Sequence, residues 1–176
     1  MSHGSDAPKQ IVWEGKYIKV TKQGTWEYVS RTRGVTAAVI LAVDEGHVIL
    51  VEQYRVPVGA TCIELPAGLV GDETEGEAVE TAAIRELEEE TGYRAAHMVD
   101  LGRFHASPGM SSEAFTLLRA EGLEKVGDGG GVDAHEAIEV HRVPLDGVAA
   151  FLAQKREEGA AADVKLLLLL GAGMLR

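Results

Sequence analysis

Three glutamates near the middle of the chain, Glu86, Glu89 and Glu90, are the residues whose type and spacing point most directly to chemistry. They lie in residues 77–91, a stretch rich in Ala, Leu, Glu and Arg that is followed by Gly92, which predicts a helix. At about 100° per residue, Glu86 and Glu90 fall within the apolar stripe of that helix. Carboxylates one turn apart repel each other, and partly buried charges are costly unless they are paired or coordinated. A hard cation such as Mg2+, which prefers oxygen ligands, would resolve both problems.

An acidic helix can also be explained without a metal ion. Its glutamates could form ordinary intrahelical ion pairs, for example between Arg85 and Glu89. The placement of Glu86 and Glu90 on the apolar side favours metal binding. Glu88 points to the opposite side and is expected to be solvated.

The spacing around these glutamates resembles the Nudix box: Gly71, five residues, Glu77, seven residues, and then the run that begins at Arg85 and Glu86 and includes Gly92. From about Val12 onward the chain is similar to the ADP-ribose pyrophosphatase branch of the Nudix superfamily. The strings that carry this similarity are Gly24-Thr25-Trp26-Glu27, Val51-Glu52-Gln53-Tyr54-Arg55, Glu64-Leu65-Pro66-Ala67-Gly68, Ser107-Pro108-Gly109 and Glu136-Ala137-Ile138-Glu139-Val140. The resemblance implies an α/β (α+β) Nudix fold, with a mixed β-sheet sandwiched between helices and a small N-terminal β meander.

The resemblance also implies a metal site. Glu86 and Glu90 would be the principal ligands of Mg2+, or of Mn2+ as a substitute, and Glu89 would assist them. The backbone carbonyl of Ala67 would be a further ligand. Arg85 would orient the glutamates of the box.

One departure from the family pattern concerns the position of this carbonyl. In this branch the five-residue spacing usually begins at the glycine after the alanine, here Gly68, whereas in this chain it begins at Gly71. About three extra residues therefore separate Ala67 from the helix. Whether the Ala67 carbonyl reaches the metal is left open.

The implied reaction is attack of water on one phosphorus of a diphosphate, with metal ions neutralising the phosphates. By resemblance, Glu136 is the general base, and Asp133 and His135 are alternatives. Glu136 could also be an ordinary exposed residue at the start of a strand. The glycine-rich run of residues 127–131 predicts a flexible loop that closes over substrate.

Three residues near the N-terminus are candidates for substrate binding. Trp26 could stack on a purine or pack in the core, and Glu27 could accept a hydrogen bond from the exocyclic amine of the base. Arg31, on the same meander, is a further candidate.

Three more candidates lie further along the chain. Arg55 could clamp phosphate or carboxylate, or form a surface ion pair. Glu64 lies within an apolar strand and needs a polar partner, which substrate or Arg55 would supply. Glu113 follows the loop of residues 107–109 and is a candidate contact to the distal sugar.

We expect the chain to divide into three parts. Residues 1–9 are expected to be a disordered leader, residues 10–34 a β meander used for dimerisation and base binding, and residues 35–176 the Nudix hydrolase domain. Apolar, β-branched runs predict strands at 35–43, 47–53, 61–65, 97–101, 114–120 and 137–143, with a hairpin turn at 44–46. Later helices are predicted at 144–156 and 161–174. The meander is too short to bury its own apolar face, so it must pack against something. The resemblance to the ADP-ribose branch implies a homodimer that exchanges N-terminal strands.

Composition limits the classes of partner. The net charge of −11 over 176 residues opposes binding to DNA or RNA. No apolar run approaches the roughly 20 residues of a membrane helix, so a cytoplasmic protein is expected. Cys62 is the only cysteine and is expected in the core.

The function expected from these residues is Mg2+-dependent hydrolysis of a nucleoside diphosphate sugar, with ADP-ribose giving AMP and ribose 5-phosphate. GDP-mannose or another nucleoside diphosphate sugar is an alternative substrate. A catalytically silent Nudix-like ligand sensor is an alternative of a different class.

Overall fold

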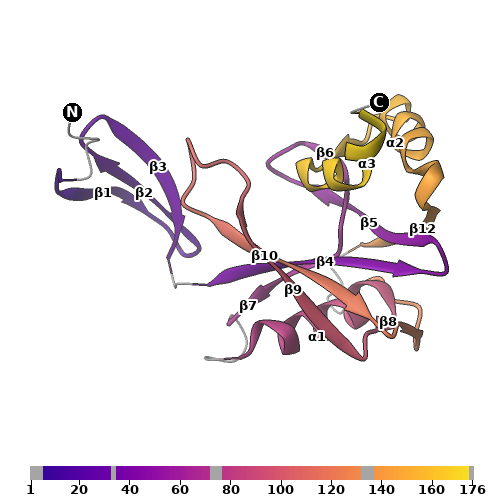
Figure 1. The fold of residues 1–176 in the computed structure, drawn as a ribbon. Coiled ribbons are helices and arrows are strands. Elements are labelled where there is room, and N and C mark those ends of the chain that lie inside the picture. Colours follow the sequence, from indigo (N-terminus) through magenta and orange to yellow (C-terminus); the bar gives the residue numbers. More distant parts are fainter. Residues whose placement is uncertain (1–5, 33–34, 72–76, 132–136, 175–176) are drawn as a thin grey trace.

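The computed structural model describes residues 6–32, 35–71, 77–131 and 137–174, and its centre is an eight-stranded mixed sheet (Figure 1). Its strand order is β13-β6-β5-β4-β10-β9, with β12 paired to β5 and β7 paired to β4. β10 runs parallel to β4 and β13 runs parallel to β6, whereas the other pairings are antiparallel. The strands are β4 (Thr36–Asp44), β5 (His47–Arg55), β6 (Ala60–Glu64), β7 (Ala67–Val70), β9 (His97–His105), β10 (Ala114–Glu121), β12 (Glu139–Pro144) and β13 (Ala161–Ala162).

Both faces of the sheet are covered. Ala38 and Ile40 of β4 pack in a core with Leu87 of α1 (Val79–Thr91). Val39, between them, packs in a second core with Leu152 of α2 (Val148–Glu157), which α3 (Leu167–Met174) helps to cover. Strands that are buried on both faces are apolar throughout, which explains why these runs show no polar alternation. The predicted sheet between helices is confirmed.

The N-terminal meander is a separate antiparallel sheet of three strands, β1 (Lys9–Glu14), β2 (Ile18–Gln23) and β3 (Trp26–Arg31). It lies beside the connection between β9 and β10 (Figure 1). Val29 of β3 donates a backbone hydrogen bond to Met110 and accepts one from Ser112. Several large apolar side chains of the meander remain exposed within this chain, among them Ile11, Val12, Trp13 and Tyr17.

The largest differences from the prediction are at β7 and at the predicted C-terminal helix. Strand β7 was not predicted, and it follows Pro66 directly. The predicted helix at 161–174 is instead strand β13, a 3-10 turn (Val164–Leu166) and the short α3. The Asp163 carboxylate accepts a hydrogen bond from the Lys165 backbone and caps the turn, while the Asp163 N–H donates to Ile63 of β6. The chain therefore joins the sheet before it turns into a helix.

The remaining elements are small. The predicted helix at 144–156 begins with a 3-10 turn (Leu145–Gly147) before α2. Strands β8 (Tyr93–Arg94) and β11 (Glu124–Lys125) form a two-stranded sheet after α1. No helix in the described part of the chain is long and apolar enough to cross a membrane.

Candidate active site

A cleft of about 800 Å³ opens where α1, β7 and the ends of several strands meet. This volume is in the range of small-molecule sites. It brings together most of the residues that the sequence suggested, although they are distant in the chain. The predicted site residues that line it are Arg31, Arg55, Glu64, Ala67, Glu86, Glu89, Glu90 and Glu113.

Helix α1 and strand β7 meet at the acidic wall of the cleft. Glu90 is only 8% exposed, and its Oε2 accepts a hydrogen bond of 3.1 Å from the backbone N–H of Ala67. Gly68 lies so close to Glu86 that a Cβ at this glycine would stand 2.1 Å from the Glu86 Cγ and Cδ atoms. The backbone at Ala67 is therefore in contact with the carboxylate groups of α1.

The connection between Ala67 and α1 begins with β7, which pairs with β4 from Ala67 opposite Val39 to Val70 opposite Thr36. Gly71 follows with a φ of 83°, a left-handed conformation that favours glycine. With the longer spacing of this chain, Ala67 still contacts Glu90 of α1.

Arg85 forms ion pairs with three glutamates. Its Nη2 is 3.1 Å from Glu86 Oε1 and 3.7 Å from Glu77 Oε2, and its Nη1 is 3.1 Å from Glu89 Oε2. The intrahelical pair with Glu89 that was considered as an alternative is therefore present. One guanidinium shared among these acids does not balance their charge.

The cations of the cleft are each held by one carboxylate. Arg31 Nε donates to Glu113 at 2.6 Å, and Lys165 Nζ lies 2.7 Å from Asp163 Oδ2. Among the described residues that line the cleft, three cationic side chains stand against six carboxylates, a net charge of −3 if all are ionised. The excess is supplied by the glutamates of α1. A cleft with this charge repels a diphosphate unless cations enter with it.

Glu64 is the most buried acid of these pairs, and its partner is Arg55. Two hydrogen bonds join them, Nε to Oε1 at 2.6 Å and Nη2 to Oε2 at 2.9 Å. The hydrogen bonds that Arg55 donates to Glu64 raise the pKa of Arg55 above its usual value. The polar partner that Glu64 required is therefore Arg55, and the pair lies at the cleft and not on the outer surface.

Comparison with known proteins assigns the family. A family model described as the NUDIX domain matches residues 32–166. The chain belongs to the Nudix family. It is 39% identical over 120 residues to an ADP-ribose pyrophosphatase of Bacillus subtilis, and 38% identical over 119 residues to a methanol dehydrogenase activator of Bacillus methanolicus.

Each of these two alignments covers 68% of this chain and 63% of the relative, so the chain spans less than two thirds of either relative. A crystal structure of an ADP compounds hydrolase superposes on 95% of this chain and 91% of its own chain, with a TM-score of 0.71 and 23% identity. That likeness supports the Nudix fold.

The N-terminal candidates divide between the cleft and the outer surface. Arg31 reaches the cleft with its partner Glu113. Trp26 is 51% exposed, so it is not in the core of its own chain, and neither Trp26 nor Glu27 lines the cleft. Their assignment to substrate requires another chain or a movement of the meander.

The proposed bases Asp133, His135 and Glu136 lie outside the described residues. The preceding glycine-rich run, residues 127–131, lies outside the helices and strands, and its last two glycines contact the end of α1. Gly130 N–H donates to Glu90 O at 2.8 Å and Gly131 N–H donates to Glu89 O at 3.0 Å, so the run is fastened to the end of α1.

Sequence reasoning missed two charged residues of this Nudix cleft, Asp163 and Lys165, because they were placed inside a helix. An Asp two residues before a Lys, next to an apolar run, is a capping pattern that could have revealed the turn. Cys62 is buried as expected but also lines the cleft, and burial raises the pKa of its thiol.

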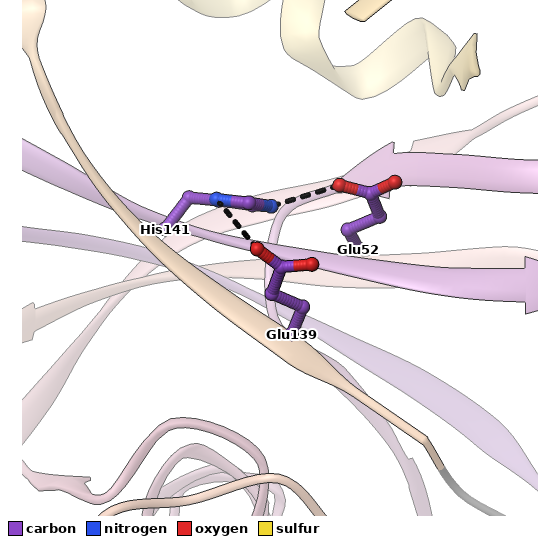
Figure 2. A group of neighbouring side chains, drawn as sticks. All are labelled: Glu52, Glu139 and His141. Atoms are coloured by element: carbon purple, nitrogen blue, oxygen red, sulfur yellow. Dashed lines mark hydrogen bonds and ion pairs between the residues drawn. The ribbon is translucent and has the colours of Figure 1, made fainter. Parts of the chain in front are cut away.

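A second group of titratable residues, Glu52, Glu139 and His141, lies outside the lining of the cleft (Figure 2). Their ligand atoms are within 4.8 Å of one another. His141 Nε2 is 2.9 Å from Glu52 Oε2, while its Nδ1 faces Glu139 at 3.9 Å, so the two ring nitrogens point to different carboxylates. Lys155 Nζ already lies 2.8 Å from the same Glu52 oxygen. Burial raises the pKa of Glu52, but hydrogen bonds from Lys155 and His141 outweigh it, and the pKa is lowered. An ion-pair network accounts for this group.

Proposed function

We propose that the protein is a Mg2+-dependent hydrolase that cleaves the diphosphate of a nucleoside diphosphate sugar, with ADP-ribose giving AMP and ribose 5-phosphate as the first substrate to test. The observation that carries the proposal is the convergence of Glu86, Glu89 and Glu90 with the Ala67 backbone in a cleft of net negative charge. The relative from Bacillus subtilis, named an ADP-ribose pyrophosphatase, supports the choice of substrate.

The donor set fits a hard divalent cation. Glu86 and Glu90, assisted by Glu89 and the Ala67 carbonyl, would supply oxygen ligands only, as Mg2+ prefers. When bound, Mg2+ or its substitute Mn2+ neutralises phosphate charge and lowers the pKa of water. Arg85 holds Glu86 and Glu89 by ion pairs and so orients their carboxylates before any cation enters.

The other residues of the proposal bind substrate or move a proton. Arg55 and Arg31 would present N–H donors to the diphosphate, and their partners Glu64 and Glu113 keep the guanidinium groups in fixed orientations. Glu136 is our proposed general base, and Asp133 and His135 are the alternatives.

The base of the substrate would be held by a second chain. Trp26 and Glu27 are outside the cleft of their own chain, and the apolar side chains of the meander are exposed. A homodimer that exchanges the meander, counted as residues 10–34 beside a catalytic domain at 35–176, would cover those side chains and bring Trp26 to the partner's cleft.

The test is a product assay with the purified protein, Mg2+ and a panel of ADP-ribose, GDP-mannose and other nucleoside diphosphate sugars. We expect AMP and ribose 5-phosphate from ADP-ribose, and loss of turnover on chelation with recovery on addition of Mg2+. Preference for another sugar nucleotide would keep the chemistry and change the substrate. Binding without turnover of any member of the panel would favour a ligand sensor and overturn the proposal.

A further inference from the structure

The acidic side chains in the last turn of α1 do not stabilise the end of the helix. This turn carries Glu88, Glu89 and Glu90 at the end of the helix where the dipole is negative, and it contains no basic residue. Helix ends fray when nothing outside the helix fixes them. The proposed metal ligands Glu89 and Glu90 nevertheless need positions fixed to a fraction of an ångström. Contacts from outside the helix must supply that order.

The last four carbonyl groups of α1, those of residues 88–91, are all hydrogen-bonded. Glu88 O accepts from the Gly92 N–H at 2.8 Å, within the cap itself. Gly131 and Gly130 N–H groups donate to the carbonyls of Glu89 and Glu90. The fourth carbonyl, that of Thr91, accepts from Lys125 Nζ at 2.8 Å. Three of the four partners therefore come from residues 125–131, which we call the clasp.

Backbone packing between the clasp and α1 leaves no space for a side chain at Gly129 or at Gly92. A Cβ at Gly129 would stand 2.4 Å from the Thr91 carbonyl carbon and 2.6 Å from Glu90 O. A Cβ at Gly92 would stand 2.2 Å from Gly127 O. These are contacts to backbone atoms, which cannot move aside as the end of a side chain can. The glycines therefore allow the two backbones to touch at the residues that carry the carboxylates.

The clasp also supplies the positive charge that the helix end lacks. Lys125 reaches from β11 to the Thr91 carbonyl, and its ammonium group lies 4.7 Å from the centre of the Tyr93 ring. A cation at a helix C-terminus interacts favourably with the dipole. Lys125 thus opposes the unfavourable effect of three neighbouring glutamates.

We propose that the clasp positions Glu89 and Glu90 for metal binding, with Gly129, Gly130 and Lys125 as positioning residues. This inference rests on the proposed function in assigning a metal to these glutamates. It gives the glycine run a role in supporting the metal site, which differs from the closure over substrate that the sequence predicts.

The chain offers two matched controls for substitutions in the clasp. Gly129 and Gly46 both have a φ of 74°, but a Cβ at Gly46 would have nothing within 4 Å. Gly130 has a φ of 105°, and Gly159, again with open space around it, has a φ of 96°. The pairs G129A with G46A and G130A with G159A therefore share similar backbone strain. In the first pair only the Gly129 Cβ would collide with α1, and in the second pair only the Gly130 N–H is bonded to α1, at Glu90 O.

Three measurements separate an effect on positioning from an effect on folding. Binding of Mn2+ to the substrate-free protein, followed by the electron paramagnetic resonance of free Mn2+, needs no turnover. Steady-state kinetics with ADP-ribose and thermal melting are measured on the same proteins. We expect G129A and G130A to weaken Mn2+ binding and lower kcat by about 10–100-fold, as the loss of support around metal ligands typically does. The G46A and G159A proteins should lose thermal stability without either change.

If G129A does not fold, G130A decides the question. Its Cβ would meet only Ile138 O at 3.7 Å, an ordinary contact, so the substitution acts through strain at a φ of 105° on the N–H that donates to Glu90 O. Folded clasp variants that match their controls in Mn2+ affinity and kcat would overturn the inference. Failure of the unaltered protein to hydrolyse any nucleoside diphosphate sugar would instead overturn the proposed function, and the Mn2+ comparison would still judge the clasp.

Discussion

Glu90 shows how one carboxylate can be both structural and available for chemistry. It is among the least exposed acids of the described chain, and one of its oxygens is held by the Ala67 N–H. Burial of a carboxylate is costly unless polar or charged groups compensate for it. Glu90 also lines the cleft beside Glu86 and Glu89, where a cation could bind.

The first prediction concerns the metal ligands. Glu90→Gln and Glu86→Gln each remove a charged ligand without removing volume, so we expect turnover to fall by about 100-fold or more, the scale of losing one preorganised electrostatic partner. Melting temperatures without metal should hold or rise because repulsion between glutamates is relieved. Steady-state kinetics against Mg2+ and thermal melting measure both effects.

Glu88→Gln is the matched control on the same helix. Glu88 faces away from the cleft and pairs with Arg94 at 2.7 Å on an exposed surface, where an ion pair contributes little. Its turnover should remain within about twofold of the unaltered protein. Near-normal Mg2+-dependent turnover of both ligand variants would refute the metal assignment.

A second prediction concerns the proposed base. Glu136→Gln should lower kcat by about 100-fold or more while KM changes little, because a general base acts on the attacking water and not on the bound sugar. Michaelis kinetics over a range of pH measure this split. A variant with unchanged kcat would direct the search to Asp133, His135 or Glu89.

At the scale of elements, β7 determines where α1 can place its carboxylates. Gly68→Ala would put a methyl group into the Glu86 side chain, which is flexible and can swing away at little cost to folding. We therefore expect turnover to fall by about 100-fold, as misplacement by about 1 Å can do, with little change in melting temperature. Gly171→Ala, in α3 with open space around the glycine, is the control. Equal activity of the two variants would show that Glu86 tolerates displacement.

Local signals predicted the elements that depend on local chemistry. The turn between β4 and β5 has positive φ at Glu45 (45°) and Gly46 (74°), the geometry that its sequence favours in hairpins. Helix α1 ends at Gly92 with a φ of 70°, as the glycine indicated. Strand β13 could not be predicted in this way, because its pairing with β6 is a tertiary contact and the leucines after it favour a helix.

The candidate site likewise combines residues that local sequence patterns indicate with residues that only the tertiary fold brings together. The spacing of Glu86 and Glu90 indicated a shared face because both are on one helix. The pairing of Arg31 with Glu113 joins residues 82 positions apart, and nothing local signals it. For Lys165, the cap at Asp163 could have indicated a turn, but the place of Lys165 in the cleft depends on the attachment of Asp163 to Ile63, which no local pattern indicates.

At the scale of the whole molecule, the exposed meander leads to a prediction about assembly. A homodimer should form in which Trp26 stacks on the substrate base in the partner's cleft. Trp26→Ala should then raise KM by roughly tenfold or more, since stacking one base is worth about 1–3 kcal/mol, and should lower kcat less. Sedimentation gives the mass and Michaelis kinetics give the constants. The dimer should survive the substitution. A monomer at micromolar concentration would refute the exchange, and an unchanged KM would remove Trp26 from the site.

The parallel pairing of β13 with β6 determines when the cleft can be completed during synthesis. Ala161 pairs with Cys62, which precedes it by 99 residues, so the wall that carries Lys165 is made long after the strand on which it rests. At ribosomal rates of about 5–20 residues per second, that delay is roughly 5–20 s. Until then β6 presents an unpaired edge, which is a template for aggregation. The nascent chain therefore completes its cleft and protects its sheet edge in the same late step.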